Sequence, residues 1–153
     1  MSFVSKFHCG AAALGLALCG AASAEEHIVK GVITQWQPLV TFAQPGDTIR
    51  FTGMTGHDST SMEGLIPEGA EMWGSKMGEE GFSITVDKEG GYVFKCTPHI
   101  TTGMVGVIVV GDDDPANMAD LEANSGNVKV GGNMVKRALR KTKKALEKRA
   151  AGG

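Results

Sequence analysis

The chain of 153 residues is long enough for one domain, and its formal net charge of −2 is small. The charge is unevenly placed, because residues 136–149 contain eight Lys or Arg and one Glu, whereas acidic residues predominate elsewhere. We expect a solvated helix face for most of these basic residues, with some contribution of electrostatics to docking. We expect no nucleic-acid partner. Membrane binding is not expected either, because the apolar side of the basic segment contains no Trp or Phe.

Residues 1–24 have the features of a secretory signal peptide. Lys6 provides a basic start, an apolar stretch rich in Ala and Gly follows, and Ala22-Ser23-Ala24 has the small-x-small pattern of a cleavage site. Cleavage there would leave Cys96 as the single cysteine of the remaining chain. We therefore expect an exported protein without an intrachain disulfide, located in a bacterial periplasm.

Short segments of alternating apolar and polar residues follow, which is the pattern of β-strands buried on one face. The alternation places Tyr92, Phe94 and Cys96 on the inward side of one such segment. Turn signals between the segments favour an antiparallel β-sandwich or barrel. Residues 70–76 are expected to form a short helical turn. The strands are expected within 28–42 and at 48–51, 82–86, 92–96 and 105–110.

The pattern changes after residue 112. Asp114-Pro115 can open a helix that continues over 116–123, and a second helix is expected at 133–149. The second helix has a narrow apolar stripe that should pack against the sandwich, formed by Val135, Leu139, Thr142 and Leu146. We therefore divide the chain into a domain at 25–112 and a helical extension at 113–153 packed on that domain.

A run of nine residues, 96–104, contains a thiolate, an imidazole and a thioether. Singly, each residue type is usually structural, but two His, one Cys and a weak axial Met form the ligand set of a blue-copper site. His57 lies upstream, after a strand-like segment, and could supply the second imidazole. Zinc is a poorer match because Met is a poor zinc ligand. The predicted ligands of one copper ion are therefore His57, Cys96, His99 and Met104.

Further motifs carry a family resemblance. They are Pro-Gly-Asp-Thr at 45–48, Gly-His at 56–57, Ile-Pro-Glu-Gly-Ala-Glu at 66–71, Cys-Thr-Pro-His at 96–99 and Val-Gly-Asp at 110–112. With these motifs, residues 45–111 resemble the pseudoazurins, small periplasmic blue-copper proteins. The resemblance implies an all-β, Greek-key cupredoxin sandwich or barrel with two C-terminal α-helices. It also implies a mononuclear type 1 copper on the same four ligands.

Two features depart from the family pattern. Asp58 stands where family members typically have Asn, which ties the His-bearing loop to the Cys-bearing loop. An ionised carboxylate can only accept hydrogen bonds and would lower the reduction potential; alternatively, Asp58 points to solvent and does neither. The family also usually surrounds the copper edge with lysines, whereas residues 72–75 are Met-Trp-Gly-Ser. The docking face is therefore expected to be more apolar.

The surroundings of the site carry two more expectations. His99 should be the ligand nearest the surface, inside an apolar rim to which Met54, Met62, Ile100 and Met104 contribute. Signal-peptide cleavage would also expose Glu25-Glu26-His27, whose amine, amides and imidazole could hold a second Cu(II) in a square plane. The alternative is that His27 begins the first strand.

The predicted function is that of a monomeric one-electron carrier, not an enzyme, in the periplasm. Its transient partners would be redox proteins, such as a copper or haem reductase or a periplasmic dehydrogenase. Copper trafficking or storage is the alternative, since Met residues are frequent near the predicted site. A fragment of a copper oxidase or nitrite reductase is disfavoured because the chain has room for one domain and has no spare His cluster.

Overall fold

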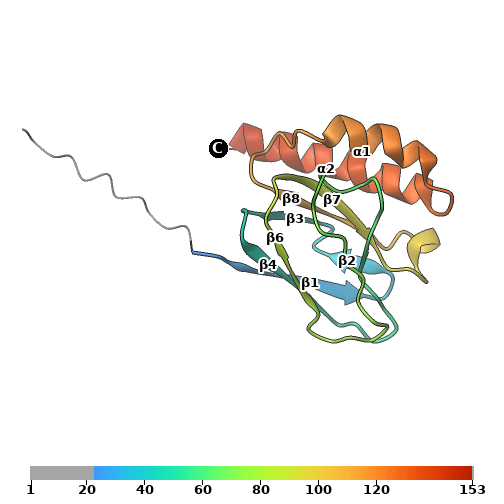
Figure 1. Ribbon diagram of the computed structural model, residues 1–153. Coiled ribbons are helices and arrows are strands. Elements are labelled where there is room, and N and C mark those ends of the chain that lie inside the picture. Colours follow the sequence, from blue (N-terminus) through green and yellow to red (C-terminus); the bar gives the residue numbers. More distant parts are fainter. Residues whose placement is uncertain (1–22, 153) are drawn as a thin grey trace, which may run out of the picture.

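The computed structural model describes residues 23–152. The predicted signal peptide lies almost entirely outside the described residues and stays a prediction. Two four-stranded sheets pack face to face, and two helices cover the outer face of one of them (Figure 1). This arrangement confirms the expected β-sandwich with two C-terminal helices.

The first sheet has the strand order β2-β1-β4-β6, and the second has the order β3-β8-β7-β5. Both sheets are mixed, because β1 runs parallel to β4 and β3 runs parallel to β8, while the other pairs are antiparallel. Hydrophobic alternation reports which face of a strand is buried but not the direction of its neighbour, so the parallel pairs depart from the antiparallel expectation. The bounds are β1 Glu26–Val32, β2 Gln35–Gln37, β3 Val40–Ala43, β4 Asp47–Thr52, β5 Thr60–Ser61, β6 Ser83–Val86, β7 Gly90–Lys95 and β8 Val105–Val110.

Strand β7 separates two apolar clusters. Tyr92 and Phe94 face the space between the sheets, together with Cys96 just beyond the strand, as the alternation predicts. Val93 faces the other way and packs under the helices. Strand β8 is buried along its whole length because it has the first sheet on one side and the helices on the other. The residue run that follows β7 therefore starts from a rigid, fully packed strand.

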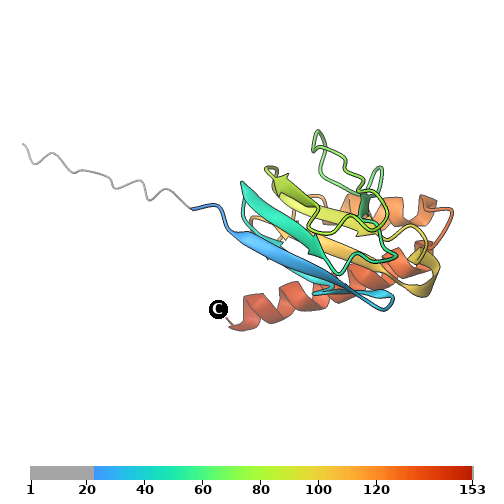
Figure 2. The ribbon, with the colours of Figure 1, turned by 90° about the horizontal axis from the view of Figure 1, so that it is seen from below.

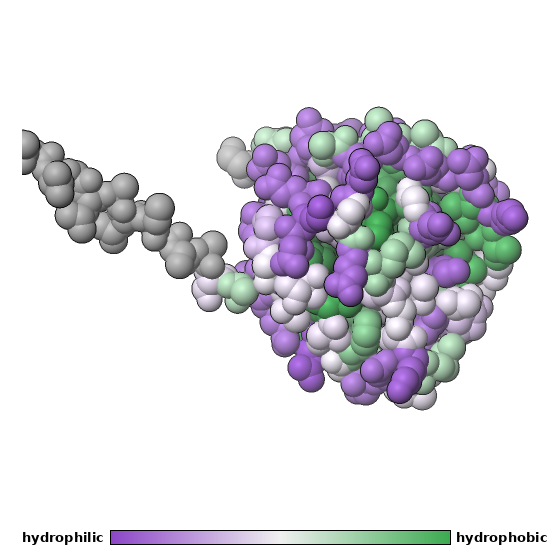
Figure 3. Space-filling view, in the orientation of Figure 1, coloured by the Kyte–Doolittle hydropathy of each residue, from purple (hydrophilic) through white to green (hydrophobic). Residues whose placement is uncertain are grey.

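Two helices and a short connecting turn complete the chain. Helix α1 spans Met118–Asn124, the turn η2 spans Ser125–Asn127, and helix α2 spans Gly132–Gly152. The inward stripe of α2 contains the four predicted residues and Ala138, which confirms how this helix packs. In the view from below, the strands of the first sheet lie in front of the helices (Figure 2). The upper edge of the space-filling view, over the helices, is largely hydrophilic (Figure 3), in keeping with the basic outer face of α2.

The expectation of a helical turn at residues 70–76 is wrong. Gly74 instead forms an isolated bridge with Thr60, and Trp73 exchanges hydrogen bonds with Ser61. These long-range contacts use backbone groups that a helical turn would have used locally.

Among residues 23–152, no helix combines the length and the apolar character needed to span a membrane.

Candidate metal centre

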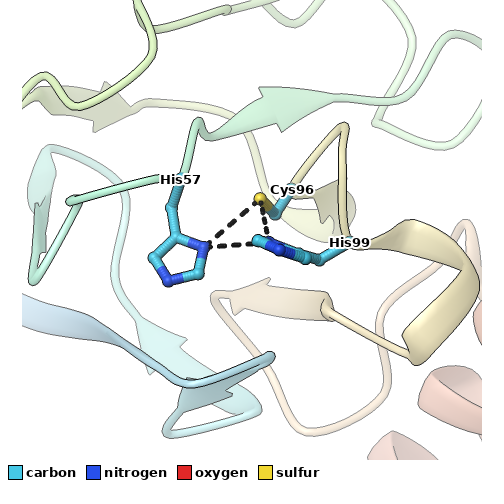
Figure 4. A group of neighbouring side chains, drawn as sticks. All are labelled: His57, Cys96 and His99. Carbon is cyan, nitrogen blue, oxygen red and sulfur yellow. Dashed lines mark hydrogen bonds between the residues drawn. The ribbon is translucent and has the colours of Figure 1, made fainter.

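The predicted ligands lie on two loops at one end of the sandwich. His57 lies in the loop that follows β4, and Cys96 follows β7 directly. His99 precedes the short helix η1 (Ile100–Thr102), and Met104 comes immediately before β8. Figure 4 shows His57, Cys96 and His99 directed towards one another. The two loops are far apart in the sequence but meet because β5, which follows the His57 loop, pairs with β7 through Thr60 and Lys95.

The run from Cys96 to Met104 is closed by its own backbone. The Cys96 N–H donates to the Met104 carbonyl at 3.0 Å, and the Met104 N–H donates to the His99 carbonyl at 3.0 Å. The His99 N–H in turn donates to the Cys96 carbonyl at 3.2 Å. These bonds hold the backbone of Cys96, His99 and Met104 in one tight turn between two buried strands.

The donor atoms have the separations of a metal site. His57 Nδ1 and His99 Nδ1 are 3.1 Å apart, and Cys96 Sγ lies 3.6 Å from the first and 3.4 Å from the second. An ion at the centre of the triangle formed by these three atoms would lie about 2 Å from each of them. This distance is close to the lengths of metal bonds to histidine nitrogen and cysteine sulfur. The residues present therefore fit a mononuclear ion.

Burial affects the protonation of two of these side chains in the same direction, towards the neutral form. The pKa of His57 is lowered, first by burial and then by the charge of His99, which outweigh the opposing charge of Asp58. The pKa of the Cys96 thiol is raised, chiefly by burial. A neutral imidazole is ready to ligate, whereas binding through Cys96 requires release of the thiol proton.

The fourth predicted ligand, Met104, is fully buried. Its methyl group and the His57 ring both approach the backbone of β1 at Gly31. A Cβ placed on Gly31 would lie 3.4 Å from Met104 Cε, 3.0 Å from His57 Cδ2 and 2.8 Å from the Gly53 carbonyl oxygen. Gly31 thus closes one side of the site by its lack of a side chain. Sequence reasoning missed it because no local turn signal surrounds it.

Asp58 points inward, so the alternative in which it faces solvent is wrong. Its side chain is buried, and its carboxylate accepts hydrogen bonds from Thr97 N–H at 2.6 Å, Thr97 Oγ1 at 2.6 Å and Thr60 Oγ1 at 2.8 Å. Burial by itself would raise the pKa of this carboxyl, but the hydrogen bonds from Thr97 and Thr60 outweigh that effect and lower it. An ionised Asp58 therefore ties the His57 loop to the Cys96 loop.

The expected apolar rim is largely wrong. Met54 and Met104 belong to the core between the sheets, whereas Met62 and Ile100 pack in the cluster under the helices. All four are buried by their packing in these two clusters. His99 is half-buried while His57 is buried, which agrees with His99 as the ligand nearest the surface.

The N-terminal segment does not favour a second copper site. His27 lies within β1, paired with Ile49 of β4, and its Nε2 is 2.8 Å from an Asp47 carboxylate oxygen. The Glu25 N–H donates to the other Asp47 oxygen at 2.8 Å. The backbone and imidazole that a square-planar site would need are thus engaged in the strand, as in the alternative interpretation of His27.

The comparisons with known proteins agree with this centre. Residues 26–111 match the model of copper binding proteins of the plastocyanin/azurin family. A pseudoazurin of Paracoccus pantotrophus is 39% identical over 108 residues, which cover 67% of this chain and 73% of that protein. A pseudoazurin of Methylorubrum extorquens is 36% identical over 107 residues, covering 65% and 72% respectively.

The fold agrees as well. The solved structure of a pseudoazurin from Sinorhizobium meliloti matches with a TM-score of 0.66 at 38% identity, over 84% of this chain and 99% of that chain. The donor set of two imidazoles, a thiolate and a thioether is the one that copper takes in such proteins, so the cofactor is copper. The chain therefore belongs to the plastocyanin/azurin family of copper-binding proteins, and within that family to the pseudoazurins.

Proposed function

We propose that the protein is a periplasmic one-electron carrier that binds one copper through His57, Cys96, His99 and Met104 and passes electrons between redox proteins. The observation that carries the proposal is the convergence of three donor atoms, all within 3.6 Å of one another, where two loops meet at the end of the sandwich. The family of copper-binding pseudoazurins supports it. The periplasmic location rests on the signal-peptide pattern of residues 1–24.

The chain contributes a rigid frame for this function. Copper bound there would supply the Cu(II)/Cu(I) couple. The backbone bonds across residues 96–104 and the packing of Met104 and Cys96 in the core keep the donors in one arrangement. A frame that does not rearrange when an electron arrives or leaves favours fast transfer.

Half-buried His99 provides the route to the surface. It is the more exposed of the two ligand imidazoles, so a partner protein can come closest to the copper there. A carrier that alternates between a donor and an acceptor needs a short-lived contact, which suits a small interface. We infer that transient redox partners meet the protein at this edge and that the carrier itself is monomeric.

Copper trafficking is the competing function. A trafficking protein would offer sulfur ligands at its surface, and Met72 and Met77 are indeed exposed. Met54, Met62 and Met104 are buried, however, and take no part in such a surface. The buried Cys96 between two imidazoles favours the electron carrier, because its thiolate would give copper the strong copper–thiolate bond of a type 1 site.

The test is a visible and electron paramagnetic resonance spectrum of the protein loaded with Cu(II), compared with that of Cys96→Ser. An intense absorption band with narrow copper hyperfine splitting, both lost in Cys96→Ser, is the expected result. A pale spectrum that is the same in both proteins would contradict the carrier and would favour trafficking through other ligands. Reversible one-electron reduction of the coloured form completes the test.

A further inference from the structure

Asp58 differs from the other buried polar groups of the centre in carrying a charge without a cationic partner. The hydrogen bonds that its carboxylate accepts from Thr97 N–H, Thr97 Oγ1 and Thr60 Oγ1 all come from neutral donors. Among residues 23–152, no Lys, Arg or His forms an ion pair with it. Its negative charge is therefore held in place but is not neutralised.

The position of this charge relative to the ligands matters. Asp58 is the neighbour of His57 in sequence, and its two bonds to Thr97 place the carboxylate beside the residue that follows Cys96. The carboxylate is thus fixed between the loops that carry His57 and Cys96, where its charge acts on the position of the metal. Buried charges are weakly screened by salt, so this interaction persists at physiological ionic strength.

We propose that Asp58 is a positioning and potential-tuning residue, whose fixed negative charge makes the bound copper favour Cu(II) and lowers its reduction potential relative to an amide at the same place. The proposal rests on the proposed function, because it concerns the same copper centre. A negative charge near the metal opposes the arrival of an electron, so it weakens Cu(I) binding relative to Cu(II) binding.

Asp58→Asn is the direct test because it keeps the shape of the side chain and removes only the charge. The amide oxygen can still accept from Thr97 N–H, and the hydroxyls of Thr97 and Thr60 can rotate to accept from the amide nitrogen. The tie between the loops should therefore remain. Slow hydrogen exchange of the Thr97 amide in the copper-free variant checks this without reference to the metal.

The chain also offers a matched control. Asp47 is a second buried carboxylate that accepts two backbone N–H bonds, from Glu25 and Gln44. It stands at the far end of β4, whose six residues extend about 20 Å at roughly 3.3 Å per residue. Asp47→Asn makes the same chemical change at a similar depth, but far from the copper.

The measured quantities are the reduction potential and the ratio of Cu(I) to Cu(II) dissociation constants, obtained by competition with chelators. In Asp58→Asn the preference for Cu(I) should rise at least about tenfold. For a one-electron couple, each factor of ten raises the reduction potential by about 59 mV. In Asp47→Asn it should change less than about twofold. A shift in Asp58→Asn that is absent, negative or matched by Asp47→Asn would overturn the proposal.

A second variant keeps the proposal testable if Asp58→Asn loses copper. Thr60→Val removes one donor but leaves the charge, so the carboxylate is less stabilised and the preference for Cu(I) should fall. An unchanged or higher preference would count against the tuning role.

The spectrum of the wild-type protein separates the two proposals. Without a type 1 spectrum, the proposed electron carrier itself fails. A blue wild type together with an unshifted potential in Asp58→Asn refutes only the role of Asp58.

Discussion

Two buried carboxylates, at the start of β4 and in the loop beyond its end, show how one residue type serves different purposes in this protein. Asp47 accepts bonds from Glu25 and Gln44 and contacts His27, so it fastens the beginning of β1 to the turn before β4. Asp58 joins the two ligand loops and has only neutral partners. The first carboxylate holds the fold, and the second holds the metal centre. The difference lies in the neighbours of each carboxylate, since both residues are buried to a similar degree.

The largest expected effect that would separate the two regions comes from Asp47→Ala. The substitution leaves two backbone N–H groups and His27 without their acceptor, and breaking such a buried network costs about 3 kcal/mol. Urea unfolding of the copper-free protein should show this loss. The type 1 spectrum of the folded variant should stay as in the wild type, and a changed spectrum would mean that the two regions are coupled.

Gly31→Ala tests the region of the centre by a smaller and more local change. The added methyl group would press on the Gly53 carbonyl and the His57 ring, and overpacking of this kind costs about 1–3 kcal/mol. We expect an altered copper spectrum together with this loss of stability. A wild-type spectrum would show that the ring of His57 is free to move away from β1.

The smallest effect is the pH dependence that Asp47 brings. Burial by itself would raise the pKa of Asp47, but the bonds from Gln44, Glu25 and His27 outweigh it and lower the pKa from 3.8. A carboxyl whose pKa is lowered by folding stabilises the native state above its unfolded pKa, and this contribution disappears as the pH falls through the folded value.

The stability advantage of the wild type over Asp47→Asn should therefore shrink as the pH falls below about 5. Urea unfolding of both copper-free proteins across this range measures it. An advantage that grows as the pH falls would contradict the assigned direction of the pKa shift.

Local sequence patterns predicted much of the fold. The alternation in residues 92–96 gave the correct inward face of β7, and the spacing from Val135 to Leu146 gave the buried stripe of α2. Both predictions depend on periodicity within one element, which the backbone geometry of strands and helices guarantees. The helical turn at 70–76 failed because the bonds of Trp73 go to Ser61, a contact that no local pattern reveals.

The sequence by itself determined the kind of site, since residues 96–104 place Cys96, His99 and Met104 in one short turn and their chemistry selects copper. Only the tertiary structure decided how His57 joins them from the loop between β4 and β5, that Gly31 lies against the site, and that Asp58 turns inward. The physical reason is that ligand type and short spacing are properties of a local segment. The direction of a buried charge depends instead on which donors the folded chain brings to it.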